Sequence, residues 1–172
     1  MKRKMVLNIA LLASLAFSLV MPVMVGAAPQ KGKNLPLFEA RTIDGRKVSQ
    51  STYTGKVLLL AVTSDACDAC KKAAPRFNEL SKTYEKQGFQ MLGIHYGTNY
   101  GIENLKTLIK DYNIGFTMAL IDEKTVKNTL GIFGVPCYVL LNKKGTIAGI
   151  YRGFNDVNYK LMEKQLKISL AE

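Results

Sequence analysis

Two cysteines separated by two residues, Cys67 and Cys70, are the residues of this chain best suited to chemistry. They follow a strongly apolar run, residues 57–62, and precede a helical pattern. A helix that begins near Cys67 directs free backbone N–H groups and the positive end of its dipole at that sulfur, which favours the thiolate. Cys70, one turn further along, is then expected to be covered and placed to attack a mixed disulfide formed at Cys67. The spacing therefore predicts a redox-active dithiol.

Other uses of these cysteines fit the sequence less well. A purely structural disulfide between Cys67 and Cys70 closes so small a loop that it removes little entropy from the unfolded chain. Three cysteines and the single histidine, His95, provide no second ligand pair at the spacing of a zinc site. Haem attachment needs a histidine directly after the second cysteine, where this chain has Lys71. We therefore expect no metal and no other cofactor.

The first 27 residues have the pattern of an export signal. Residues 2–4 are basic, residues 5–25 are almost entirely apolar, and the small residues Gly26, Ala27 and Ala28 follow. This order predicts a secretory signal peptide that is cleaved after Ala27. Because the apolar run is close to the ~20 residues that span a bilayer, an uncleaved membrane anchor is the alternative. Both readings place the functional part outside the cytoplasm, in the periplasm or on the outer face of the cytoplasmic membrane.

The remaining chain has the composition of one globular domain. The 172 residues are 48% hydrophobic and 22% charged, which is typical of a folded protein. We expect a linker over residues 28–36, a single domain over residues 37–172, and a monomer. Loss of residues 2–4 reduces the net charge from +11 to +8. The basic residues are dispersed and not interleaved with aromatic residues, which argues against nucleic-acid binding.

The apolar pattern of the domain predicts alternating strands and helices. Strands are expected over residues 38–42, 56–63, 89–96, 116–121, 138–141 and 147–151. Helices are expected from the cysteine pair to residue 88, over residues 102–112 and 122–130, and around residues 159–168. Asp44-Gly45 predicts a hairpin near the N-terminus, and the turn at residues 142–145 predicts a second one. The result is an α/β fold with a central mixed β-sheet flanked by helices and an N-terminal β-hairpin extension.

In this order, the features resemble the thioredoxin superfamily, and most closely its exported thiol–disulfide oxidoreductases of the TlpA/ResA type. The resemblance spans residues 35–172 and includes Asp44-Gly45, Gly55-Lys56, Cys67-Asp68-Ala69-Cys70, Pro75 and Gly134-Val135-Pro136. It implies a thioredoxin-like fold, with Val135 and Pro136 at the substrate and a cis peptide bond before Pro136. An X–Pro bond tolerates the cis form, and a proline at a strand start removes a backbone donor where an incoming chain could dock.

The chain departs from the family pattern around the dithiol. Ala66 stands where family members usually have Trp, and the chain contains no Trp. Ala61 and Ala73 stand where related proteins have acids that accept the proton of the second cysteine. The proton acceptor is therefore not assigned. Asp65 and Asp68 are the nearest carboxylates by sequence, and they act either as modulators of the dithiol or as solvated turn residues.

Other residues near the dithiol are candidate modulators. Asp68 opposes a thiolate at the start of the helix and Lys71 favours it, and such exposed charges each contribute less than about 1 kcal/mol. Cys137 directly follows the proline and is expected beside the dithiol, where it either modulates the pair or packs as a small apolar side chain. His95 is expected at the end of a strand rather than as a base.

The predicted reaction is thiol–disulfide exchange, in which Cys67 attacks a substrate disulfide and Cys70 resolves the mixed disulfide. Composition does not set the direction. The resemblance implies a reductase of disulfides such as those of apocytochromes before haem attachment, with disulfide-bearing protein substrates and a membrane-bound or exported thiol protein as electron donor. The alternatives are a disulfide oxidase or isomerase, and a binding module without turnover. A peroxiredoxin-type peroxidase fits less well, because the residues before Cys67 lack the Pro-x-x-x-Thr/Ser-x-x-Cys pattern.

Overall fold

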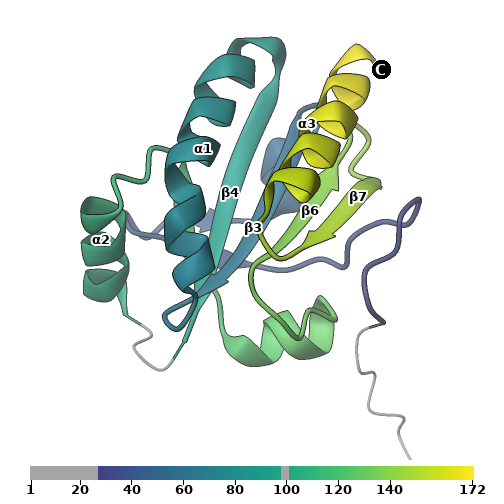
Figure 1. The fold of residues 1–172 in the computed structure, drawn as a ribbon. Helices are drawn as coiled ribbons and strands as arrows, with labels where there is room; N and C mark the ends of the chain where they lie inside the picture. The colour runs from purple at the N-terminus through teal and green to yellow at the C-terminus, as the bar shows by residue number, and fades with distance from the viewer. Residues whose placement is uncertain (1–26, 98–100) are drawn as a thin grey trace, which may run out of the picture.

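One mixed β-sheet forms the centre of the protein, in a computed structural model that describes residues 27–97 and 101–172. The strand order is β2-β1-β5-β4-β3-β6-β7 (Figure 1). The strands are β1 (Ala40–Thr42), β2 (Lys47–Val48), β3 (Val57–Ser64), β4 (Phe89–Tyr96), β5 (Thr117–Leu120), β6 (Cys137–Leu141) and β7 (Ile147–Arg152). β4 pairs parallel with β3 and β5, whereas the outer pairings are antiparallel. The predicted α/β fold with a mixed sheet is confirmed.

The long helices of the described residues pack on one face of this sheet. They are α1 (Asp68–Tyr84), α2 (Ile102–Asp111) and α3 (Asp156–Ala171). In Figure 1, α1 and α3 lie side by side in front of the sheet, and their apolar side chains share one core with β3, β4 and β6. α2 packs against β5 through Leu105. This face therefore holds the helix that begins at the cysteine pair.

Shorter elements cover the opposite face. η1 (Gln50–Tyr53), η3 (Thr125–Thr129) and the N-terminal segment around Phe38 pack there in a second core, and η2 (Glu85–Gln87) links α1 to β4. The helix predicted over residues 122–130 is largely the single π-helical turn η3. Asp122 caps this turn as expected, because its carboxylate accepts the Thr125 backbone N–H at 2.7 Å.

β3 is buried on both of its faces. Every residue from Val57 to Val62 is at most 2% exposed, and alternate residues enter the two cores because successive side chains of a strand point in opposite directions. This explains the near-continuous apolar run that predicted a central strand. The strand leads directly to the cysteine pair.

Both predicted hairpins are present. β1 and β2 pair around Gly45, whose φ of 82° is readily adopted only by glycine, and β6 pairs with β7 across the second turn. β1 begins at Ala40 rather than at residue 38, because Phe38 packs into the core instead of pairing in the sheet. The hairpin joins the sheet edge through β5.

The predicted signal peptide or membrane anchor lies outside the described residues, apart from Ala27. Within residues 27–97 and 101–172, no helix is long and apolar enough to cross a membrane. Part of the predicted linker contacts the domain, since the Gly32 N–H donates to the Ile147 carbonyl at 2.8 Å and Asn34 forms a β-bridge with Thr146. The division into linker and domain stays a prediction.

Candidate redox site

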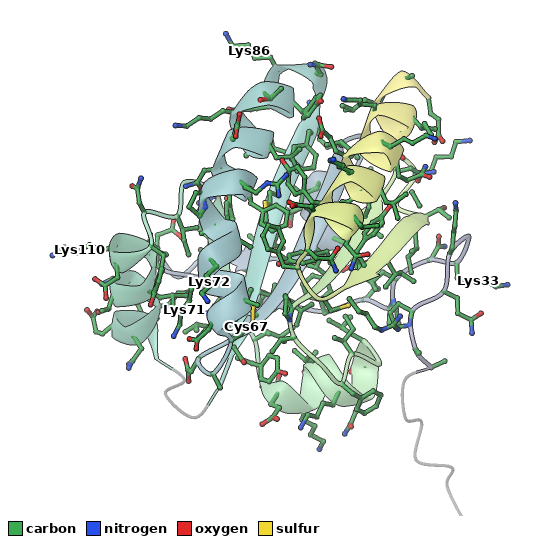
Figure 2. All side chains as sticks on the ribbon, in the orientation of Figure 1. Lys33, Cys67, Lys71, Lys72, Lys86 and Lys110 are labelled. Atoms are coloured by element: carbon green, nitrogen blue, oxygen red, sulfur yellow. A yellow bond between two sulfur atoms is a disulfide. The ribbon has the colours of Figure 1, made fainter. Side chains whose placement is uncertain are left out.

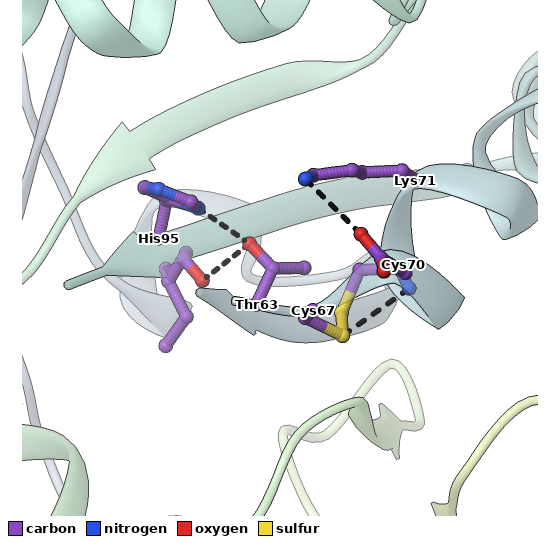
Figure 3. Close-up of a disulfide and its surroundings, with 7 residues drawn as sticks. Thr63, Cys67, Cys70, Lys71 and His95 are labelled. Carbon is purple, nitrogen blue, oxygen red and sulfur yellow. Dashed lines mark hydrogen bonds and ion pairs between the residues drawn. A yellow bond between two sulfur atoms is a disulfide. The ribbon is translucent and has the colours of Figure 1, made fainter. Parts of the chain in front are cut away.

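Cys67 and Cys70 form a disulfide at the start of α1. Their Cα atoms are 5.3 Å apart. Cys67 is the N-cap residue of α1, as predicted, and its Sγ accepts the Cys70 backbone N–H at 3.2 Å (Figure 3). The sulfur therefore lies at the positive end of the helix dipole, where a thiolate is stabilised.

The exposure of the two cysteines is the reverse of the prediction. Cys67 is only 5% exposed, whereas Cys70 is partly exposed. The turn after β3 folds back on itself, because the Cys67 N–H donates to the Ser64 carbonyl at 3.1 Å and the Cys67 carbonyl accepts the Lys71 N–H at 3.3 Å. The expectation that Cys70 is the more covered residue is wrong for the disulfide-bonded form.

The peptide bond between Val135 and Pro136 is cis, as the resemblance implies. Pro136 is buried, Val135 is half-buried, and Phe133 of the same loop is 63% exposed. β6 begins directly after Pro136 and pairs with β3 from Val62 backwards, so the cis-proline loop lies at the end of β3 that leads to the disulfide. The loop and the cysteines therefore meet at one edge of the sheet.

Cys137 lies on the sheet face opposite α1. It is 1% exposed and packs in the core that contains Val62 and Ile132. Burial raises the pKa of the Cys137 thiol, and the positive charge of Arg152 opposes this rise. These surroundings suit a small apolar side chain. A modulating role for Cys137 stays a prediction.

Asp68 and Lys71 form an exposed ion pair at the start of α1. The Asp68 side chain is 84% exposed, and its Oδ1 is 3.3 Å from Lys71 Nζ. Lys71 also lies over the Tyr112 ring, 5.7 Å from its centre. Figure 2 shows Lys71 and Lys72 projecting near Cys67, and the other labelled lysines lie apart around the surface. The opposite charges of the pair offset one another beside the disulfide.

Sequence reasoning did not connect Asp65 with His95. His95 is 3% exposed, its Nε2 is 2.7 Å from Asp65 Oδ1, and its Nδ1 is 3.0 Å from Thr63 Oγ1. Thr63 and His95 are register partners near the ends of the parallel strands β3 and β4. The available signal was that each of two apolar strands carries a polar residue near its end. Such residues lie close together when the two strands pair in parallel.

A small cavity lies between α1, α2 and the sheet. Its volume is about 30 Å³, and it is bordered by Cys70, Thr63, His95, Ala61 and Tyr138. Its lining is mainly apolar, with Met91 and Met118 among the other residues. The cavity therefore connects the second cysteine of the pair with the buried histidine.

Comparison with known proteins agrees with this arrangement. The model of the AhpC/TSA family matches residues 31–150, more than half of the chain. The chain belongs to the AhpC/TSA family. Among curated relatives of this AhpC/TSA protein, thiol-disulfide oxidoreductase ResA of Bacillus thuringiensis subsp. konkukian is 25% identical over 123 residues, which cover 71% of this chain and 69% of the relative. ResA of Bacillus subtilis is 22% identical over 147 residues, which cover 84% and 80%.

Solved structures show the same fold. A protein from Chlorobium tepidum described as a thiol:disulfide interchange protein DsbE superposes with a TM-score of 0.76 at 22% identity, covering 83% of this chain and 99% of its own. The thioredoxin domain of a thiol-disulfide oxidoreductase from Bacteroides vulgatus gives a TM-score of 0.70 at 23% identity, covering 81% and 99%. The AhpC/TSA protein thus has a thioredoxin-like fold and is a thiol–disulfide oxidoreductase.

Proposed function

We propose that this protein is an extracytoplasmic thiol–disulfide reductase of protein substrates, with Cys67 as the attacking thiol and Cys70 as the resolving thiol. The observation that carries the proposal is the position of Cys67 Sγ at the N-terminus of α1, where it accepts the Cys70 N–H. That position stabilises the thiolate that must attack a substrate disulfide. Cys70 is within disulfide distance for the second step.

The proposed reaction has two steps. The Cys67 thiolate attacks one sulfur of the substrate disulfide, forming a mixed disulfide and releasing the other substrate sulfur as a thiolate. The Cys70 thiolate then attacks Cys67 Sγ, the bond from Cys67 to the substrate breaks, and the second substrate sulfur leaves as a thiolate. The substrate gains two electrons and the dithiol loses them. A thiol protein outside the cytoplasm then returns the disulfide of Cys67 and Cys70 to the dithiol.

The electrostatics around Cys67 favour the reducing direction. A disulfide is strongly oxidising where the reduced, thiolate form is strongly stabilised. Here Cys67 Sγ accepts one backbone N–H, and the nearby cation Lys71 is paired with Asp68. Lys72 adds a positive charge near Cys67, but it is exposed and therefore contributes little. One backbone donor, a cation paired with an acid and an exposed cation give modest thiolate stabilisation, which supports a low reduction potential.

The substrate site of the proposal is the loop that contains the cis peptide bond. Val135 and Pro136 lie at the sheet edge next to the disulfide, and the neighbouring Phe133 exposes its ring. The Pro136 nitrogen carries no hydrogen, so a substrate strand meets no competing backbone donor there. By resemblance, exported proteins such as apocytochromes before haem attachment are the proposed substrates.

Reduction of insulin by the purified protein with dithiothreitol as electron source tests the catalytic part of this proposal. We expect the wild type to accelerate insulin precipitation above the dithiothreitol background, and Cys67→Ser to show the background rate alone. Equal rates for both proteins would contradict the proposal and identify a binding module that keeps the fold without turnover.

The location requires its own test. We expect the protein expressed from its full sequence to appear outside the cytoplasm, either as a mature chain that begins at Ala28 or as a membrane-bound chain that keeps its first residues. Fractionation of cells followed by mass determination of the N-terminal peptide separates these two forms. A full-length chain in the cytoplasmic fraction would contradict the extracytoplasmic role.

A further inference from the structure

Resolution of the mixed disulfide requires Cys70 to lose its proton, because the thiolate is the nucleophile. Ala61 lines the cavity beside Cys70 and accepts no proton. His95, the only histidine of the chain, is one of the titratable residues that line the same cavity. We infer that His95, held between Thr63 and Asp65, accepts the Cys70 proton through a water molecule in this cavity and the Thr63 hydroxyl, and passes a proton to solvent at Asp65. The inference rests on the proposed function, since it concerns the resolving step.

The cavity has room for the water that the transfer needs. A volume of about 30 Å³ exceeds the ~10–15 Å³ that one water molecule occupies by the same measure. Its lining residues include Cys70, Thr63 and His95, which carry a sulfur, a hydroxyl and an imidazole. Figure 3 shows Thr63 between His95 and the two cysteines. A single water molecule can therefore bridge the Cys70 thiol and the Thr63 hydroxyl, which contacts His95.

The hydrogen bonds around His95 satisfy both of its charge states. Asp65 Oδ1 requires a donor and so assigns a hydrogen to Nε2. When His95 is neutral, Nδ1 accepts from the Thr63 hydroxyl at 3.0 Å. When His95 is protonated, Nδ1–H donates to Thr63 Oγ1, and the hydroxyl turns to donate to the Ile94 carbonyl at 3.3 Å. Rotation of one hydroxyl hydrogen is therefore enough for His95 to gain and lose a proton.

Asp65 gives this pair an exit to solvent. Its side chain is 28% exposed and borders a separate open pocket of about 370 Å³, which Asp111 and Tyr112 also line. The close approach of Asp65 depends on Gly97, because a Cβ at that position would overlap its carboxylate. The contact between His95 Nε2 and Asp65 Oδ1 therefore connects the buried ring to a partly exposed carboxylate.

The other titratable groups that face the cavity do not serve as the acceptor. Lys71 is an ammonium group with donors only and is paired with Asp68. Burial strongly raises the pKa of Tyr138, so its hydroxyl stays protonated. Tyr112 lies at the outer rim, where its ring contacts Lys71. His95 alone among these groups has a nitrogen that can accept a proton, which it receives through the Thr63 hydroxyl, and a carboxylate at its other ring nitrogen.

The transfer balances within the proposed step. The Cys70 S–H bond breaks and its proton moves to the water, the water gives a proton to Thr63 Oγ1, and the Thr63 hydroxyl gives its hydrogen to His95 Nδ1. The resulting Cys70 thiolate attacks Cys67 Sγ. The disulfide between Cys67 and Cys70 forms as the substrate sulfur leaves with the electron pair of the broken bond. Asp65 then takes the Nε2 proton and passes it to solvent, and tautomer exchange through water returns the remaining ring hydrogen from Nδ1 to Nε2.

Single-turnover oxidation of the reduced protein with a limiting amount of dithiobis(nitrobenzoate) tests the inference, in a Cys137→Ala background that leaves two thiols. The first release of thionitrobenzoate reports attack by Cys67, and the second reports resolution by Cys70. We expect His95→Gln to slow the second phase at pH 7 by at least about tenfold, at the low end of general base catalysis, and to leave the first phase unchanged. The difference in second-phase rate between His95→Gln and the wild type should vanish at alkaline pH, where Cys70 loses its proton without a protein base.

Two further variants separate proton transfer from structural damage. Tyr138→Phe borders the same cavity and removes a hydroxyl that has no hydrogen-bond partner among the described residues, so we expect wild-type phases. Asp65→Asn keeps the ring in place and should slow the second phase less than His95→Gln. An unchanged second phase in His95→Gln, or an equal loss in both phases at every pH, would overturn the inference. If the reductase proposal fails instead, the protein does not reduce insulin although both phases of thionitrobenzoate release remain intact.

Discussion

Cys70 and Cys137 lie at the same end of the sheet but on opposite faces, and their surroundings differ. Cys70 borders a cavity that also contains Thr63 and His95. Cys137 lies in a core of apolar side chains, where burial raises the pKa of its thiol. The Cys70 thiol therefore borders polar groups that can carry its proton away, whereas the Cys137 thiol is surrounded by apolar side chains. The comparison shows that polar neighbours, and not the residue type, define the redox site.

A second contrast separates the two carboxylates that flank the disulfide. Asp65 pairs with a histidine whose side chain is 4% exposed, whereas Asp68 pairs with Lys71 in solvent. Both acids are close to Cys67 in sequence. Only Asp65 is tied to the interior of the protein, so we expect only Asp65 to influence stability and the resolving step.

Replacement of single cysteines should give the largest difference between the two faces. Cys70→Ser leaves the mixed disulfide unresolved, so turnover with insulin should fall by about two orders of magnitude or more, and mass spectrometry should detect the trapped adduct on Cys67. Cys137→Ala should keep turnover within about twofold, because the proposed exchange uses only Cys67 and Cys70 and the Cys137 side chain packs as a small apolar group. A comparable loss in Cys137→Ala would show that the third thiol modulates the pair.

The two ion pairs should differ in their contribution to stability. His95→Ala removes the hydrogen bond between the buried imidazole and Asp65 Oδ1, which should lower the free energy of unfolding by about 2 kcal/mol. Asp68→Asn acts on an exposed pair and should change it by less than about 0.5 kcal/mol. Urea denaturation followed by circular dichroism measures both. Equal losses would refute the distinction drawn between Asp65 and Asp68.

Alkylation should separate the thiols of the reduced protein. The raised pKa of Cys137, above the ordinary 9.0, lowers its thiolate fraction at pH 8, so iodoacetamide should label it at least about tenfold more slowly than Cys67. The direction of the Cys137 pKa shift also sets how the free energy of unfolding depends on pH. A thiol with a raised folded-state pKa contributes fully below pH 9 and loses that contribution as the pH rises further. Labelling of Cys137 as fast as Cys67 would contradict its placement in a dry core.

Two glycines offer a smaller test of the Asp65 position. A Cβ at Gly97 would overlap the Asp65 carboxylate, so Gly97→Ala should cost about 1–2 kcal/mol of stability as the side chain is displaced. Gly134→Ala places its Cβ in open space and serves as the matched control, with little change expected. Equal effects of the two substitutions in thermal unfolding would count against a tightly held Asp65.

Much of the scaffold follows from local patterns. The apolar run of β3 and the Asp44-Gly45 turn specify their elements through side-chain burial and turn chemistry. The start of α1 at Cys67 follows from where the helical pattern begins. The cis peptide bond before Pro136 followed from the family resemblance and not from the local residues.

The proton route could not be predicted, because it depends on how separate segments align. Thr63 and His95 become neighbours only through the register of β3 with β4, and no local pattern encodes that register. The reversed exposure of the cysteines belongs instead to a local turn between Ser64 and Lys71, which the sequence pattern did not indicate. The position of the inferred proton acceptor is therefore set by the pairing of β3 with β4, which local sequence patterns do not encode.

The reduction potential of the Cys67–Cys70 couple tests the central claim most directly. Because the chain contains no Trp, the oxidation state is best read from the mass shift on alkylation after equilibration in dithiothreitol buffers of graded ratio, with Cys137→Ala protein. A reductase with modest thiolate stabilisation predicts a potential below about −250 mV, whereas a value near −120 mV would identify an oxidant and contradict the account.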